Sequence, residues 1–236
     1  MKLKQLEGLL GGLQQFPQPK VELEQYPTGP HIASRMLFTV FPLSLYLPCF
    51  FYVSFAVHEN QAENSFEDVS DKVVADFGCG CGTLGVAAAL LSAEHVLGID
   101  IDPESLEIAS NNAEELEVDI DFIQSNVMDL GWRGRIVDTV IMNPPFGTRK
   151  KGADLDFLSV ALKVASQAVY SLHKTSTRDH VKRTALRDFN ASSAEVICEL
   201  RYDVPKMYKF HKKKEVDIAV DLWRFVPAAS HQSRNT

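Results

Sequence analysis

Asn143, Pro144, Pro145 and Phe146 form the tetrapeptide whose residue types point most directly to chemistry. Two adjacent prolines fix the backbone and remove its N–H donors. The remaining polar groups are acceptors, namely the side-chain oxygen of Asn143 and the carbonyl oxygen of Pro144, and Phe146 offers a flat face on which a base can stack. This set suits an amino group that carries two hydrogens.

An exocyclic amine such as adenine N6 is a poor nucleophile because its lone pair is delocalised into the ring. Acceptors on both N–H bonds favour localisation of that lone pair as positive charge develops at nitrogen, which is preorganised electrostatic stabilisation. If the electrophile is already activated, in-line positioning lowers much of the remaining barrier. Neither a catalytic His nor a metal is needed, and the four cysteines lack metal-ligand spacing, so no metal site is expected.

A glycine-rich stretch, DFGCGCG at residues 76–82, follows an apolar run and precedes an Ala-rich one. Glycines allow a tight turn and close approach of a ligand, so Gly78, Gly80, Cys81 and Thr83 are expected around a cofactor. Asp100, 22 residues after Gly78, can accept hydrogen bonds from ribose hydroxyls. The stretch also satisfies the dinucleotide fingerprint G-x-G-x-x-G, so by itself it leaves the cofactor open.

Asp76 and the Asn143 motif separate these cofactors. S-adenosylmethionine has no pyrophosphate, and its loop usually carries an acid just before the glycines. Asp76 supplies that acid, and it is expected either to hold the loop or to meet the cofactor's ammonium. The amino-acceptor motif requires an alkyl donor, so the two features together favour S-adenosylmethionine.

Strand and helix patterns alternate from residue 72 onward, which predicts an open α/β sheet with helices on both faces. In such a sheet, ligands bind beyond the carboxyl ends of the strands. We expect strands at 72–77, 95–100, 121–127, 135–142, 194–200 and 216–225, and helices near the N-terminus (up to Gly11) and at 83–93, 103–116 and 154–172.

Composition indicates an ordinary globular chain whose charges are unevenly distributed. The 236 residues contain 24 Lys+Arg and 31 Asp+Glu, for a net charge of −7, which at first argues against nucleic acid. Residues 149–214, however, contain 15 Lys+Arg against seven Asp+Glu, a surplus of eight. We expect a phosphate track beside the catalytic motif, formed by Arg149, Lys150, Lys151, Lys174, Lys212, Lys213 and Lys214. His173 is expected either to position RNA or to be packed.

Residues 40–57 run 18 residues without a charge, which is near the lower limit for a membrane span. Pro42 and Pro48 interrupt this stretch, and no cluster of basic residues flanks it. These features favour a buried or docked segment over a span, so no membrane partner is expected. Four scattered cysteines fit a reducing compartment.

With these residues in place, the chain resembles the methyltransferase-like protein 5 family. The most specific matching blocks are residues 23–36 (LEQYPTGPHIASRM), 72–82, 138–148, 169–180 and 209–222. The resemblance implies a Rossmann-like class I methyltransferase fold, with a seven-stranded, mostly parallel sheet and an antiparallel C-terminal strand. It implies transfer from S-adenosylmethionine to adenine N6 in small-subunit (18S-type) ribosomal RNA.

The resemblance also implies roles for single residues. Gln25 and Thr28 would cap the cofactor from an N-terminal arm, and Gly78, Cys81 and Asp100 would surround its methionine and ribose parts. The adenine would meet Asn126 and Val127, where Asn126 replaces the Asp of many relatives.

The same family implies a small zinc-containing activator, a Trm112-like subunit that forms a heterodimer at a sheet edge, and a location in the nucleus (nucleolus) and cytoplasm. The expected organisation is an N-terminal arm at 1–40, a hydrophobic insertion at 41–61, a catalytic domain at 62–226 and a flexible tail at 227–236. Two alternatives stay open: an N-methyltransferase acting on protein glutamine or DNA adenine, and an RNA-binding scaffold impaired in catalysis.

Overall fold

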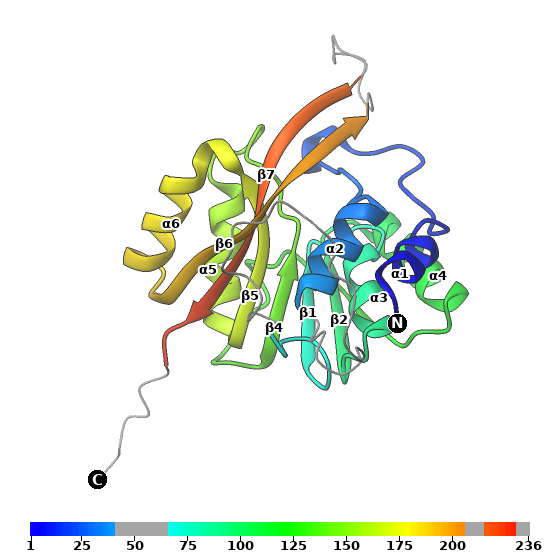
Figure 1. The fold of residues 1–236 in the computed structure, drawn as a ribbon, viewed down its shortest axis with the longest axis horizontal. Helices are drawn as coiled ribbons and strands as arrows, with labels where there is room; N and C mark the ends of the chain where they lie inside the picture. Colours follow the sequence, from blue (N-terminus) through cyan, green and yellow to red (C-terminus); the bar gives the residue numbers. More distant parts are fainter. Residues whose placement is uncertain (41–65, 206–214, 230–236) are drawn as a thin grey trace, which may run out of the picture.

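The sheet has seven strands in the order β3-β2-β1-β4-β5-β7-β6 (Figure 1), in a computed structural model that describes residues 1–40, 66–205 and 215–229. Neighbouring strands pair in parallel except at β7, which is antiparallel to β5 and β6. The strands are β1 (Val73–Phe77), β2 (His95–Asp100), β3 (Asp121–Gln124), β4 (Val137–Met142), β5 (Ala165–Lys174), β6 (Ala191–Pro205) and β7 (Glu215–Pro227). The expected fold class is confirmed.

Helices cover both faces of the sheet, and each face has its own apolar core. Side chains from α1 to α4 pack on one face, and side chains from α5 and α6 pack on the other (Figure 1). The helices are α1 (Leu3–Leu10), α2 (Pro30–Val40), α3 (Thr83–Leu90), α4 (Pro103–Glu115), α5 (Ala153–Val164) and α6 (Arg178–Arg187), with short 3₁₀ turns at Val21–Leu23 and Thr175–Thr177.

Local sequence explains why α4 begins where it was expected. Asp102 is its N-cap, and its side chain accepts a hydrogen bond from the backbone N–H of Glu104 at 3.2 Å. Pro103 occupies the first helical position, where its missing N–H costs nothing. The carboxyl end of β2, at Asp100, therefore leads directly into the start of this helix.

The single helix expected over residues 154–172 is wrong. The helix α5 ends at Val164, and Ala165 has extended backbone with ψ of 138° at the start of β5. Strand β5 lies between β4 and β7 and is buried on both faces from Ala168 to His173, so its exposure does not alternate along the strand. A stretch without clear alternation fits a helix and a buried strand equally well, and no turn residues separate the two elements.

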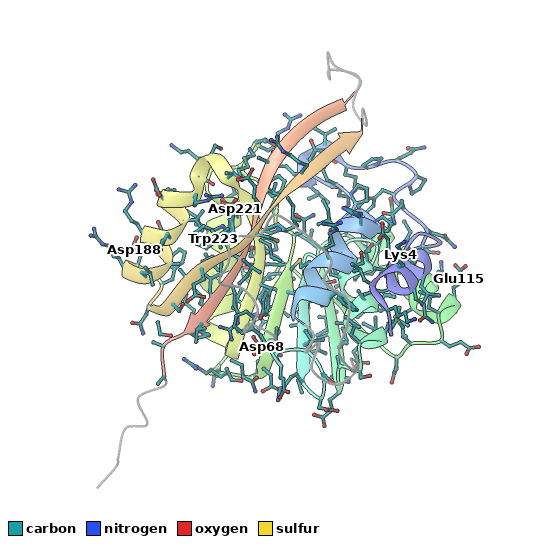
Figure 2. All side chains as sticks on the ribbon, viewed as in Figure 1. Lys4, Asp68, Glu115, Asp188, Asp221 and Trp223 are labelled. Carbon is teal, nitrogen blue, oxygen red and sulfur yellow. The ribbon has the colours of Figure 1, made fainter. Side chains whose placement is uncertain are left out.

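The last two strands form a long hairpin that runs past the other strands (Figure 1). Its pairing extends from Ala191 opposite Pro227 to Pro205 opposite Glu215, so both strands are longer than expected. Within it, Trp223 is buried and stacks on Phe225 with ring centroids 5.3 Å apart. Figure 2 labels Asp221 and Trp223 close together in the region of the β6–β7 hairpin.

The segment that leads into β1 is fixed by a buried polar cluster at Asp68, labelled in Figure 2. The Tyr170 hydroxyl donates to Asp68 Oδ2 at 2.7 Å, and Arg224 Nε donates to the same oxygen at 2.9 Å. Because Tyr170 belongs to β5 and Arg224 to β7, this cluster joins three parts of the sheet region.

Parts of several expectations lie outside the described residues, namely the hydrophobic insertion at 41–61, the basic cluster at 212–214 and most of the tail. Within the described ranges, no helix combines the length and the apolar character that a bilayer crossing requires.

Candidate functional site

A cavity of about 280 Å³ opens at the carboxyl ends of β1, β2 and β4. Its wall combines the N-terminal arm (Phe16 and residues 22–28) with the glycine loop, the end of β2 and the segment 125–128. The remaining wall comes from Asn143, Pro145 and residues of the loop and helix that follow β4. Its size is near the lower end of the range of roughly 300–1,000 Å³ typical of small-molecule sites.

The glycine loop turns sharply between β1 and α3. Gly78 and Gly80 have φ values of +67° and +53°, in the left-handed region that side chains disfavour. A Cβ atom at Gly80 would also lie 3.0 Å from the ring of Phe16. The loop backbone can therefore approach a bound ligand closely, and Cys81 and Thr83 complete this part of the wall.

Asp76 holds the loop from beneath and does not line the cavity. Its Oδ2 accepts a hydrogen bond from the backbone N–H of Gly85 at 2.8 Å, in the first turn of α3. The side chain is 1% exposed, and burial raises its pKa to about 7. Of the two roles expected for Asp76, the geometry favours holding the loop over meeting the cofactor's ammonium.

Asp100 lies in the cavity wall at the end of β2. Its Oδ2 accepts from Gly80 N–H and its Oδ1 from Asp102 N–H, both at 2.9 Å. Burial raises the pKa of this carboxyl, and the two backbone donors partly oppose that rise. Each carboxylate oxygen has a second lone pair, so Asp100 remains able to accept from ribose hydroxyls.

Ile101, next to Asp100, is 51% exposed and also lines the cavity. Such exposure of a large aliphatic side chain is explained if a flat apolar group covers it. Ile101 was not among the residues predicted to bind the cofactor, and its only sequence signal is its position directly after the acid that ends β2.

Asn126 and Val127 line the same side of the cavity, but they lie beyond β3, which ends at Gln124. The strand expected to reach residue 127 is thus shorter. The Asn126 side chain forms a local turn in which Oδ1 accepts from Met128 N–H at 3.1 Å. The Asn126 amino group can donate to a ring nitrogen of adenine, and the second lone pair of its oxygen can accept from the adenine amino group.

Asp102 organises the N-terminal arm, a role that the sequence did not suggest. It is 4% exposed and accepts hydrogen bonds from Lys20 Nζ at 2.7 Å, Gln25 Nε2 at 2.6 Å and Ser105 Oγ at 3.0 Å. Burial acts to raise the pKa of Asp102, but these hydrogen bonds outweigh it and lower the pKa. Gln25 lines the cavity while its amide anchors the arm.

The catalytic motif follows β4 directly, as expected. Asn143 and Pro145 line the cavity, whereas Pro144 is buried and Phe146 packs against the core beside α2. The amide nitrogen of Asn143 donates to Thr28 Oγ1 at 2.9 Å. The motif therefore opens on the same cavity as the glycine loop, and the arm contacts its key side chain.

Glu24 connects the arm to the loop after the motif, and sequence reasoning missed it. Its Oε1 accepts from the backbone N–H of Arg149 at 2.6 Å. The side chain is 8% exposed, its backbone is left-handed with φ of 51°, and its Oε2 has no hydrogen-bond partner among the described residues. Strained backbone and a buried unpaired oxygen at one residue are typical of functional positions.

The basic residues near the catalytic motif differ from one another in exposure and in the groups that they contact. Arg149, Lys150 and Lys151 are exposed, and Lys150 Nζ lies 2.7 Å from Asp156 Oδ2. Lys174 ends β5, with Nζ 5.9 Å from the centre of the Phe146 ring. Arg149 and Lys150 line the cavity, Lys151 follows them in sequence, and Lys174 lies beside Phe146 of the motif, while residues 212–214 are not described.

Two further basic residues near this group are engaged within the fold. Of the two roles expected for His173, the geometry favours the packed one: it is fully buried and bonds Ser171 Oγ and Asp154 Oδ2, each at 3.0 Å. Arg178 begins α6, and its guanidinium binds the buried Asp221 at 2.7 and 2.6 Å. The charge of Arg178 is therefore paired within the fold.

These features suit an adenosine-bearing sulfonium cofactor. A glycine backbone, the Asp100 carboxylate, an apolar face at Ile101 and the Asn126 amide surround one end of the cavity, and an amino-acceptor motif lies at the other. The open, mostly parallel sheet and this site together define a Rossmann-like methyltransferase.

Comparison with known proteins narrows the class. Residues 62–187 match the methyltransferase small domain family. The rRNA N(6)-adenosine-methyltransferase METTL5 of Danio rerio is 48% identical, covering 96% of this chain and all of that protein. Its Drosophila melanogaster counterpart is 42% identical over 95% and 96% of the two chains. A candidate RNA methyltransferase of Pyrococcus horikoshii superposes with a TM-score of 0.76 at 30% identity, covering 97% and 99% of the two chains. The chain belongs to the METTL5 family.

Proposed function

We propose that this protein transfers a methyl group from S-adenosylmethionine to N6 of an adenine in small-subunit ribosomal RNA. One observation carries the proposal: Asn143 and Pro145 open on the same cavity as Gly80 and Asp100. The relatives named as rRNA N(6)-adenosine-methyltransferases support the choice of adenine N6 as the methylated atom and of ribosomal RNA as the substrate.

The chain's own groups orient the reacting amine. The side-chain oxygen of Asn143 and the carbonyl oxygen of Pro144 accept hydrogen bonds from the two N–H groups of the target amine. These hydrogen bonds favour localisation of the lone pair on nitrogen as positive charge develops there. Phe146 is partly buried against the core, with Lys174 Nζ 5.9 Å from its ring centre, and is the aromatic ring against which the target base would stack. S-adenosylmethionine, held by Gly80 and Asp100, would supply an activated methyl group. As the N–C bond forms, the S–C bond breaks, S-adenosylhomocysteine leaves and the amine loses one proton to solvent.

A base within a duplex cannot reach this cavity, so the target adenine must be single-stranded or flipped out. Arg149, Lys150, Lys151 and Lys174 surround the mouth and would hold the flanking phosphates. We propose that Lys212, Lys213 and Lys214, which fall between β6 and β7 in the sequence, extend the same track. Reversing these three charges should weaken RNA binding and flatten its dependence on salt.

We also propose a Trm112-like zinc-containing activator as the partner in a heterodimer. The sheet ends in β3 and β6, and an edge strand presents unpaired backbone groups that a partner strand can bind. A substrate in ribosomal RNA suggests a location in the nucleus, including the nucleolus, and in the cytoplasm.

The test is methyl transfer by the purified chain, with and without the activator, to small-subunit RNA, protein and DNA. We expect N6-methyladenosine in the RNA product by mass spectrometry, with activity that depends on the activator. Methylation of glutamine or of DNA adenine instead would replace the proposed substrate. Cofactor binding with no transfer to any substrate would indicate the impaired scaffold, and full activity of the chain alone would remove the partner.

A further inference from the structure

Asn112, on α4, is fully buried, which is unusual for an asparagine on a helix. Asparagine is a poor helix former and is mostly exposed in folded proteins. Its neighbour Asn111 is exposed, as expected, whereas Asn112 is 0% exposed. A buried amide needs hydrogen-bond partners, so the partners of Asn112 indicate what the residue does.

Those partners are backbone groups of two other segments. Asn112 Oδ1 accepts from Gln14 N–H at 2.8 Å, and Nδ2 donates to Gln14 O at 3.0 Å, across 98 residues. Nδ2 also donates to the carbonyl oxygen of Cys81 in the glycine loop, at 2.8 Å. One side chain therefore joins α4, the N-terminal arm and the glycine loop, and it fixes the position and direction of the arm backbone at residue 14.

Phe16 follows two residues after this contact and lies over the glycine loop. A Cβ atom at Gly80 would lie 3.0 Å from its ring, and Phe16 lines the cavity together with Gly80 and Cys81. Burial raises the pKa of the Cys81 thiol to about 12, and a hydrogen bond from the Phe16 backbone opposes that rise. The arm and the loop are thus in direct contact at this part of the cavity wall.

The stretch that carries Phe16 forms neither a helix nor a strand over residues 13–20. Leu13 is buried in the core before it, and Lys20 Nζ binds Asp102 at 2.7 Å after it. Because no backbone ladder holds the stretch, the position of the ring depends on such side-chain contacts. Loss of the Asn112 amide would remove two hydrogen bonds from the arm backbone two residues before Phe16, and cofactor binding would then have to order this stretch.

We propose that Asn112 is a positioning residue for the cofactor, because it ties the arm to the glycine loop and holds the Phe16 ring as a wall of the cofactor cavity. Phe16 is the residue that touches the cofactor, and Asn112 acts through it. This inference rests on the proposed function, since it takes the cavity as the site of S-adenosylmethionine. A wall that is ordered in advance lowers the entropy cost of binding, so Asn112 affects cofactor affinity and not the transfer step.

Asn112→Ala, Phe16→Ala and the double variant test this inference, with the dissociation constant of S-adenosylmethionine measured by calorimetry. Each single variant should weaken binding about 10-fold. Because Asn112 acts through the ring, the double variant should bind less than about threefold more weakly than Phe16→Ala alone. At saturating cofactor and RNA, kcat of Asn112→Ala should stay within about threefold of wild type, while KM for the cofactor rises with the dissociation constant. Asn111→Ala, on the exposed side of α4, is the matched control and should bind the cofactor as wild type does.

Two results would overturn the inference. If Asn112→Ala weakens binding by the same factor with and without Phe16, the asparagine acts independently of the ring. If it lowers the melting temperature but leaves the dissociation constant of S-adenosylmethionine unchanged, its role is only structural. Should Asn112→Ala fail to fold, Gln14→Pro takes its place in the same cycle and should give the same pattern, because it removes from an exposed position the N–H that Asn112 Oδ1 accepts. Absence of cofactor binding by the wild-type chain would instead contradict the proposed function, and this inference with it.

Discussion

The two ends of the cavity are built in different ways. Around the glycine loop of the cofactor end, hydrogen bonds join residues that are near in sequence: Gly80 to Asp100 across 20 residues, and Gly85 to Asp76 across nine. The arm adds distant contacts there, among them the one from Gln25 to Asp102 across 77 residues. At the catalytic end, the bond from Asn143 to Thr28 spans 115 residues. The bond from Arg149 to Glu24 spans 125 residues.

This difference separates what a local motif can build from what the whole chain must assemble. A strand, a glycine loop and a helix of one βαβ unit form the centre of the cofactor end, and the arm and residues 125–128 complete its wall. The catalytic end needs the N-terminal arm to fold back over the sheet. Changes at the catalytic end should therefore reduce turnover, whereas changes at the cofactor end should alter binding or stability.

The largest effect is expected for Asn143→Ala. Loss of the acceptor should lower kcat about 10²- to 10³-fold, because the developing charge loses its stabilisation. The cofactor's dissociation constant, measured by calorimetry, should stay within about threefold, since the cofactor end is intact. Asn111→Ala, on an exposed part of α4, is the control. Near-normal turnover in Asn143→Ala would show that Asn143 does not stabilise the reacting amine and that the catalytic end lies elsewhere.

Glu24→Ala tests whether the arm contributes to turnover through the loop after the motif. Losing a charged acceptor for Arg149 N–H should cost about 1.5–3 kcal/mol, which is roughly 10- to 100-fold in kcat/KM. Glu24→Gln keeps an acceptor oxygen and should recover most of the activity. Glu107→Ala, exposed on α4, is the matched control in the same steady-state assay. Equal losses for alanine and glutamine would assign the effect to charge.

Asp76→Asn tests the cofactor end through stability. Burial raises the folded pKa of Asp76 to about 7 from an ordinary value of 3.8. Between these values the folded state keeps a proton that the unfolded state loses, so the wild-type free energy of unfolding falls as pH rises from about 4 to about 7. An asparagine side chain at this position cannot ionise, so the variant should gain roughly 1–3 kcal/mol relative to wild type between about pH 5 and pH 8.

Urea unfolding of the cofactor-free chain at several pH values measures this difference. Asp119→Asn, which changes an exposed carboxylate, should follow the wild-type pH dependence. A constant difference between Asp76→Asn and wild type at all pH values would show that folding does not shift the pKa of Asp76.

The smallest effect is expected for Lys174→Ala at the rim of the catalytic end. Loss of one phosphate contact should weaken RNA binding a few-fold and reduce the slope of log K against log salt by about 1. Fluorescence anisotropy over a range of salt concentrations measures both quantities. Lys163→Ala, exposed near the end of α5, should leave them unchanged. An unaltered slope for Lys174→Ala would show that Lys174, at the end of β5, contacts no phosphate of the RNA.

Much of the fold could be predicted because local signals were strong. The strand at 95–100 and the helix starting at Pro103 match their predictions, since alternation of apolar runs with Pro and Asp caps is local information. The helix–strand boundary at Ala165 could not be predicted, because burial between β4 and β7 removes the period that distinguishes a strand.

The site shows the same division. Asp100, Asn126 and Asn143 were predicted to face the cofactor or target, and all three line the cavity. Glu24 and Asp102 were missed as organisers of the arm, because their partners are distant in sequence or lie on another element. His173 and Arg178 are basic residues near the site, but His173 is buried and the charge of Arg178 is paired with the buried Asp221.

The sequence by itself determined the chemistry and its order along the chain: a glycine loop, an acid that ends the second strand, and an amino-acceptor motif at the end of the fourth. Each depends on residue type and short spacing, which local geometry converts directly into structure. Only the tertiary structure decided which charges reach solvent and how the arm holds Asn143. Those outcomes depend on burial and on contacts between residues 115 and 125 positions apart, and such contacts exist only when the sheet and its helices have packed.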